Sequence, residues 1–243
     1  MLIKSNKNLN QQLHNLASIN GADHFGVADL SQAHTTILEQ GGSFIAGFPF
    51  SISIGISLLN PIVDLLPQRN ENAVRVSYRH NAYDIVNLRL DLAASIISGY
   101  LQQYGFRALP IPSSKRVDDE RICASFSHKL GANLAGLGWI GKSCLFITPE
   151  YGPRVRWVTI LTDAPLESTG KMRQEQCGDC RECIDICPTH AITGRTFRAN
   201  EPREERFDAR KCDRYFDSME EKNEIAVCGL CLYVCPYGRK QKI

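Results

Sequence analysis

The sequence of 243 residues lacks an uninterrupted apolar run of the length that crosses a membrane. A spanning helix needs about 20 predominantly apolar residues. The uncharged stretch 40–63 contains four Gly, two Pro and four Ser, and its second half alternates Ser with Ile. A period of two is typical of a half-buried strand. We therefore expect a Gly/Pro-rich loop followed by a strand in this stretch, and no membrane partner.

Other common signals are missing as well. The N-terminal residues contain neither an apolar core nor a small-residue cleavage site, so we expect no secretory signal peptide. No sign of charge dominates, because 28 Lys+Arg oppose 26 Asp+Glu. This balance by itself predicts neither nucleic-acid nor membrane binding. We expect a cytoplasmic protein, in which thiols stay reduced and clustered cysteines favour metal over disulfides.

Cysteine is the residue with an unusual distribution. Two of the 10 cysteines, Cys123 and Cys144, lie in the first part of the chain, and the other eight follow Gln176. The polar segment 164–170, with Pro and Gly, reads as a linker between the two parts. We therefore predict an N-terminal domain over 1–168 and a C-terminal domain over 169–243.

Helix and strand signals alternate in the first part, which predicts an α+β fold with a mixed α/β sheet domain before a ferredoxin-like domain. Asn81 is the expected N-cap of a long helix that ends before Gly105. Its apolar stripe consists of Ile85, Leu88, Leu92 and Ile96. The expected helices are 9–19, 81–104 and 127–135, and the expected strands are 24–28, 52–56, 106–111, 144–148 and 155–162, the last two as a hairpin.

The first cysteine run is typical of a bacterial ferredoxin. It reads Cys177-x2-Cys180-x2-Cys183-x3-Cys187-Pro188, and in such runs the fourth cysteine ligates the other cluster of a pair. The two-residue gaps let one tight loop direct three thiolates at one iron–sulfur cube. The three-residue gap and the proline direct the fourth thiolate away.

A second set repeats the ending C-x2-C-x3-C-P, while its first cysteine lies upstream of an insertion. We therefore predict two 4Fe–4S clusters with crossed ligation, close enough for electrons to pass between them. The first cluster takes Cys177, Cys180, Cys183 and Cys235, and the second takes Cys187, Cys212, Cys228 and Cys231.

Structural zinc is the alternative, because paired C-x2-C motifs are common in zinc sites. Zinc explains neither the third cysteine at the same spacing nor the two Cys-Pro endings, so the paired motif favours clusters. Cys123 and Cys144 lie beside apolar residues. We expect both to be small buried hydrophobes.

A Gly-rich segment before the cysteines, 136–143, matches the phosphate-binding consensus G-x4-G-K-[ST]. A phosphate-binding loop follows a buried strand and opens a helix. Here the helix signal comes before the segment and the strand signal after it, so we expect no NTP hydrolysis. The glycines permit positive φ and a close backbone approach to a ligand or a packed neighbour.

Taken together, these segments resemble the epoxyqueuosine reductase family. The resemblance rests on 135–142 (Ala-Gly-Leu-Gly-Trp-Ile-Gly-Lys), a strand ending at Asp163 and the two cysteine sets, over nearly half of the chain. It implies an N-terminal domain that binds cobalamin and a double-cluster domain that reduces it. In that family the reduced cobalt removes the epoxide oxygen from epoxyqueuosine in tRNA. The residues implied to line the corrinoid pocket are Gly136, Gly138, Trp139, Gly141 and Lys142.

The sequence departs from this family at the proton donor. The family has a general-acid Asp in a Val-Asp-Ser-x-Pro context, and an ungapped alignment places Ile122 there. Asp119 is one candidate replacement, and His128 is the other because its ordinary pKa suits proton transfer. Fuller members continue into helical repeats that help to hold tRNA. We expect a short form without them, in which the basic residues of 237–243 are candidate phosphate contacts.

Two functions stay open at this level. The first is a corrinoid-dependent reductase that receives electrons from a low-potential donor and acts on a substrate of which tRNA is the candidate. The second is an electron-transfer protein without its own substrate, which serves a partner corrinoid or flavin protein. The combined motifs lead us to expect an iron–sulfur oxidoreductase of the first kind. The sequence does not indicate the donor or the oligomeric state.

Overall fold

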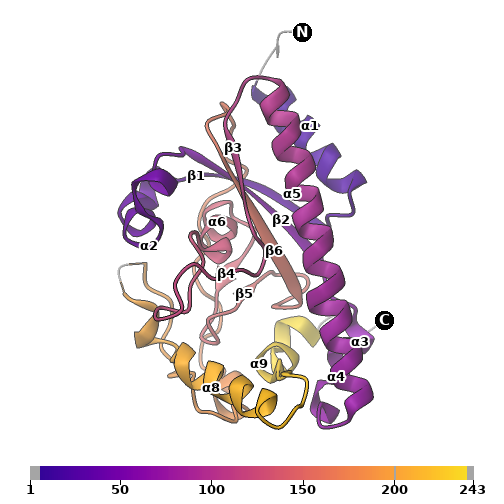
Figure 1. The fold of residues 1–243 in the computed structure, drawn as a ribbon. Helices are drawn as coiled ribbons and strands as arrows, with labels where there is room; N and C mark the ends of the chain where they lie inside the picture. Colours follow the sequence, from indigo (N-terminus) through magenta and orange to yellow (C-terminus); the bar gives the residue numbers. More distant parts are fainter. Residues whose placement is uncertain (1–5, 200, 240–243) are drawn as a thin grey trace. The chain divides into compact units, whose positions relative to one another are not determined.

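The computed structural model describes residues 6–199 and 201–239 (Figure 1). Residues 240–243, part of the predicted phosphate contact, lie outside this range. The observed class is α+β, as predicted. Within the described ranges, no helix is long and apolar enough to cross a membrane.

Backbone packing divides the chain into two compact units. We call Met1–Ile56, Asn87–Gly138 and Arg156–Arg173 the sheet unit, and Ser57–Val86, Trp139–Val155 and Gln174–Ile243 the cysteine unit. The last break lies close to the expected linker. Unlike the expected contiguous domains, the cysteine unit also includes two segments from the first part of the chain.

Four strands form the main sheet in the order β1-β2-β6-β3. β1 pairs antiparallel with β2, placing Val27 opposite Ile52, and β3 pairs antiparallel with β6, placing Leu109 opposite Leu161. A separate two-stranded sheet joins β4 to β5. The strands are β1 (His24–Asp29), β2 (Phe50–Ser57), β3 (Ala108–Ile111), β4 (Trp139–Ile140), β5 (Phe146–Ile147) and β6 (Val155–Thr162).

Helices cover the main sheet, and in the cysteine unit they carry several of the thiols. Helix α1 contacts β1 through the rings of His14 and Phe25, whose centroids are 5.2 Å apart. Helix α6 begins at Ser127, whose Oγ accepts from the Leu130 N–H. The helices are α1 (Asn6–Ile19), α2 (His34–Ala46), α3 (Asn60–Asp64), α4 (Asn72–Tyr78), α5 (Val86–Gln103), α6 (His128–Leu134), α7 (Glu182–Asp185), α8 (Ala209–Glu220) and α9 (Leu230–Val234).

Strand β2 forms where the Ser/Ile alternation predicts it, but it is buried on both faces. Ser51 and Ser53 are fully buried. A Cβ at Gly131 of α6 would lie 3.0 Å from Ser53 Oγ and 3.3 Å from Ser51 Oγ. The serine face is therefore covered by a closely packed helix, which small side chains on both partners permit.

Three expectations about the elements are wrong. Residues 40–46 belong to the kinked helix α2, in which Gly42 has a φ of 77°, and not to a loop. The long helix starts upstream of Asn81, because a π-helical segment, Arg79–Ile85, leads into α5. The strands predicted for 144–148 and 155–162 do not pair with each other, since β5 pairs with β4 and β6 joins the main sheet.

Candidate functional site

The first cysteine run forms a tight loop that leads into the short helix α7. Gly178 has a φ of 50°, a left-handed conformation that favours glycine. The Cys180 N–H donates to the Cys177 carbonyl at 3.0 Å, which closes the turn. Cys183 lies within α7, and Cys187 follows the end of this helix. The first three thiols thus come from one loop and helix turn, and the fourth lies beyond it.

The second run repeats this geometry. Gly229, directly after Cys228, also has a positive φ, of 68°, and it precedes the short helix α9 that contains Cys231. Cys235 is the C-cap of α9. Helices α7 and α9 pack against each other, and Cys212 comes from the separate helix α8. Contact between the two short helices gives the last cysteine of each run access to the other run.

The charges around the Cys183 thiol show which cysteines lie next to it. Burial, and after it the neighbouring sulfurs of Cys177, Cys235 and Cys180, together raise the pKa of Cys183 to about 11. Burial also raises the pKa of Cys235 to about 11, with Cys177 and Cys180 adding to the rise. Cys235 of the second run therefore lies among the first three cysteines. We call Cys177, Cys180, Cys183 and Cys235 the first thiol group.

The remaining four cysteines form the second thiol group, defined as Cys187, Cys212, Cys228 and Cys231. Burial raises the pKa of Cys212 to about 11, and the charges that add to the rise come first from Cys228 and then from Cys187. Burial likewise raises the pKa of Cys231, where Cys228, Cys212 and Cys187 contribute most among the charges and Cys183 contributes less. Cys187 of the first run thus lies among the cysteines of the second.

Cys187 differs from the other thiols in its hydrogen bonds. Its sulfur lies 3.5 Å from Thr189 Oγ1 and accepts from the Ala191 N–H at 3.4 Å. Burial favours the neutral thiol, but these bonds outweigh it and lower the pKa of Cys187. A sulfur with several donors around it is ready to ligate a metal as thiolate.

The donor chemistry fits iron–sulfur clusters. Thiols with a raised pKa become thiolates where strong positive charge, such as that of iron, faces them. Among the described residues, no three Cys, His, Asp or Glu side chains are close enough to hold a single metal ion. Four thiolates around a four-iron cube stand further apart than ligands that share one ion.

The part of the Gly-rich segment that begins at Trp139 lies against the first thiol group within the cysteine unit. Trp139 is fully buried and packs with Ile147, Cys177, Cys235 and Tyr237. A Cβ at Gly141 would clash with Ile147 Cδ1 and would lie 3.3 Å from Cys177 Sγ. A side chain here would have to displace the end of Ile147 and press on Cys177, so glycine permits the close approach of the cysteine loop.

Lys142 is buried and fixes the same loop. Its Nζ donates to the carbonyl oxygens of Gly178 and Cys180, the latter at 3.3 Å. In the sheet unit, Gly136 has a φ of 78°, and its carbonyl accepts from Arg173 Nε at 2.8 Å. The Gly138 carbonyl accepts from Asn133 Nδ2 at 3.3 Å. Of the five residues predicted for a corrinoid pocket, Trp139, Gly141 and Lys142 thus lie in the cysteine unit, and the other two lie in the sheet unit.

Arg69 lies beside the second thiol group, although no sequence motif marks it as a site residue. Arg69 follows the short 3-10 turn Leu66–Gln68 in the segment that joins the cysteine unit. Burial raises the pKa of Cys228, while the Leu230 N–H and the Arg69 guanidinium oppose this rise. Isolated arginines are usually solvated, so nothing in the sequence distinguishes Arg69 from the other basic residues.

Asp119 and His128, the predicted proton donors, both lie in the sheet unit. Asp119 is exposed on a turn closed by backbone bonds between Asp118 and Cys123. In the same turn Ile122 has a φ of 50°, a conformation that β-branched residues rarely adopt. The hydrogen-bond partners of His128 do not include Asp119, so no hydrogen bond joins the two candidate proton donors.

His128 makes two hydrogen bonds within the sheet unit. Its Nε2 lies 3.1 Å from the Pro112 carbonyl oxygen, and its Nδ1 lies 2.9 Å from Thr159 Oγ1. A carbonyl only accepts, so Nε2 carries the proton of the neutral ring and Nδ1 accepts from Thr159. Burial lowers the pKa of His128 to about 4. The ring is therefore neutral near pH 7, with its proton held by the backbone.

The His128→Gln variant is expected to lose part of the acid sensitivity of the fold. The folded pKa lies below the ordinary 6.5, so between these values the unfolded chain binds more protons. Stability is fully present above pH 6.5 and is lost as the pH falls towards 4, by on the order of 2 kcal/mol. Anaerobic urea unfolding between pH 4.5 and 7 measures this. If the free energy of unfolding of His128→Gln changes with pH as steeply as that of wild type, the assignment is contradicted. It is also contradicted if the exposed control His34→Gln flattens this pH dependence equally.

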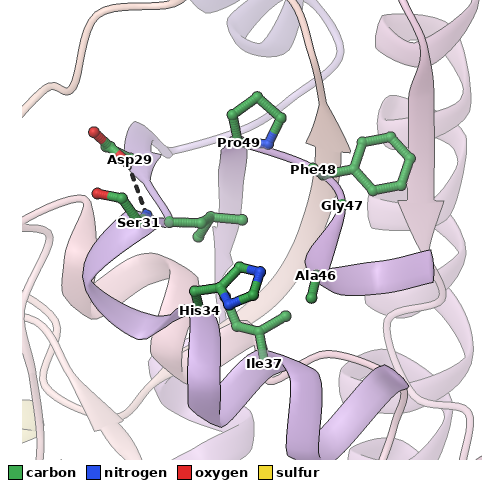
Figure 2. A pocket seen from close by; sticks show the side chains of 9 residues that line it. Asp29, Ser31, His34, Ile37, Ala46, Gly47, Phe48 and Pro49 are labelled. Atoms are coloured by element: carbon green, nitrogen blue, oxygen red, sulfur yellow. Dashed lines mark hydrogen bonds between the residues drawn. The ribbon is translucent and has the colours of Figure 1, made fainter. Parts of the chain in front are cut away.

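A shallow cavity of about 270 Å³ lies in the sheet unit between the end of β1 and helix α2 (Figure 2). Figure 2 shows Pro49 on one side of it and His34 with Ile37 on the other. The Asp29 carboxylate at its rim accepts from the Ser31 N–H at 2.8 Å. No sequence motif marks this cavity, and none of the predicted site residues lines it.

Comparison with known proteins agrees with the thiol geometry. Residues 176–238 match the family model of a 4Fe-4S double cluster binding domain. The epoxyqueuosine reductase of Pseudomonas aeruginosa is 31% identical over 177 residues, which are 68% of this chain and 43% of that protein. The chain spans about half the length or less of the curated relatives it matches.

Two solved structures have a similar fold. One, described as suggesting a mechanism for B12-dependent dehalogenation, is a reductive dehalogenase with a TM-score of 0.75 at 18% identity, over 100% of this chain and 33% of that chain. The other is an epoxyqueuosine reductase with an epoxyqueuosine-modified tRNA stem loop. Its TM-score is 0.61 at 18% identity, over 98% of this chain and 68% of that chain. The chain is therefore an epoxyqueuosine reductase-like protein that carries a 4Fe-4S double cluster binding domain over residues 176–238.

Proposed function

We propose that this chain is an iron–sulfur reductase of the epoxyqueuosine reductase type, and that each thiol group ligates one 4Fe–4S cluster. The observation that carries the proposal is the exchange of partners between the runs. Cys235 lies with Cys177, Cys180 and Cys183, and Cys187 lies with the cysteines of the second run. An exchanged fourth ligand is characteristic of two-cluster ferredoxins.

The residues of the cysteine unit bind the clusters and shield them. Trp139, Ile147 and Tyr237 pack around Cys177 and Cys235 and cover one side of the first thiol group. Lys142 fixes the carbonyls of the loop between Cys177 and Cys180. When bound, the two clusters supply one-electron transfer from a low-potential donor to the acceptor.

The acceptor follows from the relatives. Trp139, Gly141 and Lys142 are buried against the cysteine loop, and together with Gly136 and Gly138 they stay the residues predicted to line a corrinoid pocket. The reductive dehalogenase is described as B12-dependent and the epoxyqueuosine reductase structure holds a modified tRNA stem loop. We infer that this chain takes cobalamin as its electron acceptor, and modified tRNA as its first substrate class. With tRNA as the substrate, we propose that the reaction takes place in the cytoplasm.

Of the two candidate proton donors, the geometry favours Asp119. Both ring nitrogens of His128 are within hydrogen-bond distance of partners in the sheet unit. The side chain of Asp119 is exposed on its turn. An exposed carboxyl group is free to approach a bound substrate, whereas His128 must first break two bonds.

Anaerobic titration of the iron-reconstituted protein with cob(II)alamin, followed by EPR, tests this function. We expect a base-off or five-coordinate cobalt signal that saturates at one cobalamin per chain. A free-cobalamin spectrum from protein that holds both clusters would contradict the cobalamin assignment and leave electron transfer to a partner protein. Protein that holds no iron would contradict the cluster assignment itself.

A further inference from the structure

Each thiol group has a hydrogen-bond donor that comes from outside the cysteine-rich segment. Trp139 of β4 lies against the first thiol group, and Arg69 lies against the second. Both residues belong to the cysteine unit, through its segments Trp139–Val155 and Ser57–Val86. The two donors therefore reach the two groups from separate parts of the chain.

Trp139 is held so that its indole N–H faces sulfur. The side chain is fully buried, and its Nε1 makes no hydrogen bond of normal geometry within the described residues. Its ring contacts that of Tyr237 edge to face, with centroids 4.8 Å apart, and the Tyr237 hydroxyl donates to the Gln176 carbonyl at 3.0 Å. Burial raises the pKa of Cys177, and the Lys142 backbone N–H and the Trp139 indole oppose this rise. A thiolate ligand at Cys177 would give the orphaned N–H its acceptor.

Arg69 has the corresponding position beside Cys228. The turn Leu66–Gln68 that precedes it packs against α9, and a Cβ at Gly229, the residue after Cys228, would lie 2.8 Å from Leu66 Cδ1. Its Nε is buried and also makes no hydrogen bond of normal geometry within the described residues. The backbone at Arg69 is fixed, because its N–H donates to the Leu66 carbonyl at 3.1 Å and its carbonyl accepts from Arg75 Nε at 2.8 Å. Arg75 in turn forms an ion pair with Glu224 at 3.0 Å, four residues before Cys228. The guanidinium thus offers Cys228 both a donor and a fixed positive charge.

We propose that Trp139 and Arg69 set the reduction potentials of the two clusters separately, each raising the potential of the cluster that it faces. The inference rests on the proposed cluster function. Reduction adds one electron to a cluster and breaks no bond, so the reduced state carries more negative charge on its sulfurs. N–H donors and cations stabilise that state more than the oxidised state. Removal of either donor therefore lowers one potential and leaves the other unchanged.

The test is a potentiometric EPR titration of the reconstituted protein with dithionite and redox mediators. Cys180→Ala and Cys187→Ala, each of which removes one cluster, assign the two signals. We expect Trp139→Phe to lower the reduced-to-oxidised ratio of the first cluster about tenfold at a fixed potential, which for one electron is 59 mV. We expect Arg69→Gln to do the same to the second cluster, and Arg69→Lys, which keeps the charge, to have a smaller effect.

Trp139→Phe and Arg69→Gln serve as controls for each other, because each should change the potential of one cluster alone. Trp157→Phe is a third control. Trp157 is buried in β6 of the sheet unit beside the ring of His24, so its replacement should move neither potential. The inference is overturned if both clusters assemble and neither potential changes. It is also overturned if Trp139→Phe changes the potential of the second cluster or Arg69→Gln that of the first. If Trp139→Phe fails to fold, the two Arg69 variants decide alone. Wild-type protein without iron would instead overturn the proposed function.

Discussion

Replacement of Gly152 by Ala is expected to destabilise the cysteine unit strongly. Gly152 has a φ of 58°, which costs an L-residue with a side chain about 1–2 kcal/mol. A Cβ at this position would clash with the Gly238 nitrogen and would lie 2.6 Å from the Tyr237 carbonyl carbon. These are backbone atoms that cannot rotate away, and such overpacking costs about 1–3 kcal/mol more. The displaced turn directly follows Cys235, so the first cluster should be lost as well.

Iron content and anaerobic urea unfolding of the reconstituted variant measure this effect. The matched control is Gly99→Ala, because Gly99 lies within α5 and an added methyl group would meet no atom within 4 Å among the described residues. This control should be stabilised by about 0.5–1 kcal/mol, as expected for Gly to Ala in a helix. A Gly152→Ala protein with full iron and unchanged stability would show that the turn at Gly152 does not support the Cys235 segment.

The local chemistry of the site could be predicted from the sequence. Gaps of two and three residues determine which thiols one loop can direct to one point, and the two Cys-Pro endings predict the exchange of Cys187 and Cys235. Glycine directly after Cys177 and Cys228 belongs to the same pattern, because both positions need a left-handed backbone. Such short-range constraints act within a few residues.

Contacts between distant segments could not be predicted in this way. Nothing in the sequence indicates that Ser57–Val86 packs with the cysteines or that Arg69 faces Cys228. The sequence also does not indicate that Trp139 and Lys142 lie against the first cysteine loop. The partners of these residues depend on tertiary packing, which neither spacing nor periodicity encodes.

Helix α5 shows the same limit for the core. The apolar stripe predicted from the sequence is exposed, with Leu88 and Leu92 each 54% exposed. The buried side of the helix instead contains Leu90, Ile97 and Leu101. Because α5 has apolar residues on two sides, its periodicity alone does not determine which side faces the sheet.

Loss of Cys187 is expected to remove the second cluster and to leave the first intact. Cys187 precedes Pro188 and belongs to the first run by sequence, but its thiol lies among Cys212, Cys228 and Cys231. Cys187→Ala should therefore retain about four of about eight irons per chain. Cys180→Ala should retain the same number, in the other cluster. Both positions are partly exposed, so Ala at either one leaves no enclosed void and the change in iron content reports on ligation.

Iron counts of two double variants test the crossed arrangement most directly. If the ligation is crossed, Cys187→Ala/Cys228→Ala removes two ligands of one cluster and still holds about four irons. Cys187→Ala/Cys180→Ala then removes one ligand from each cluster and holds almost none. If each run instead bound its own cluster, the two results would be exchanged, and the crossed assignment of the two thiol groups would be wrong.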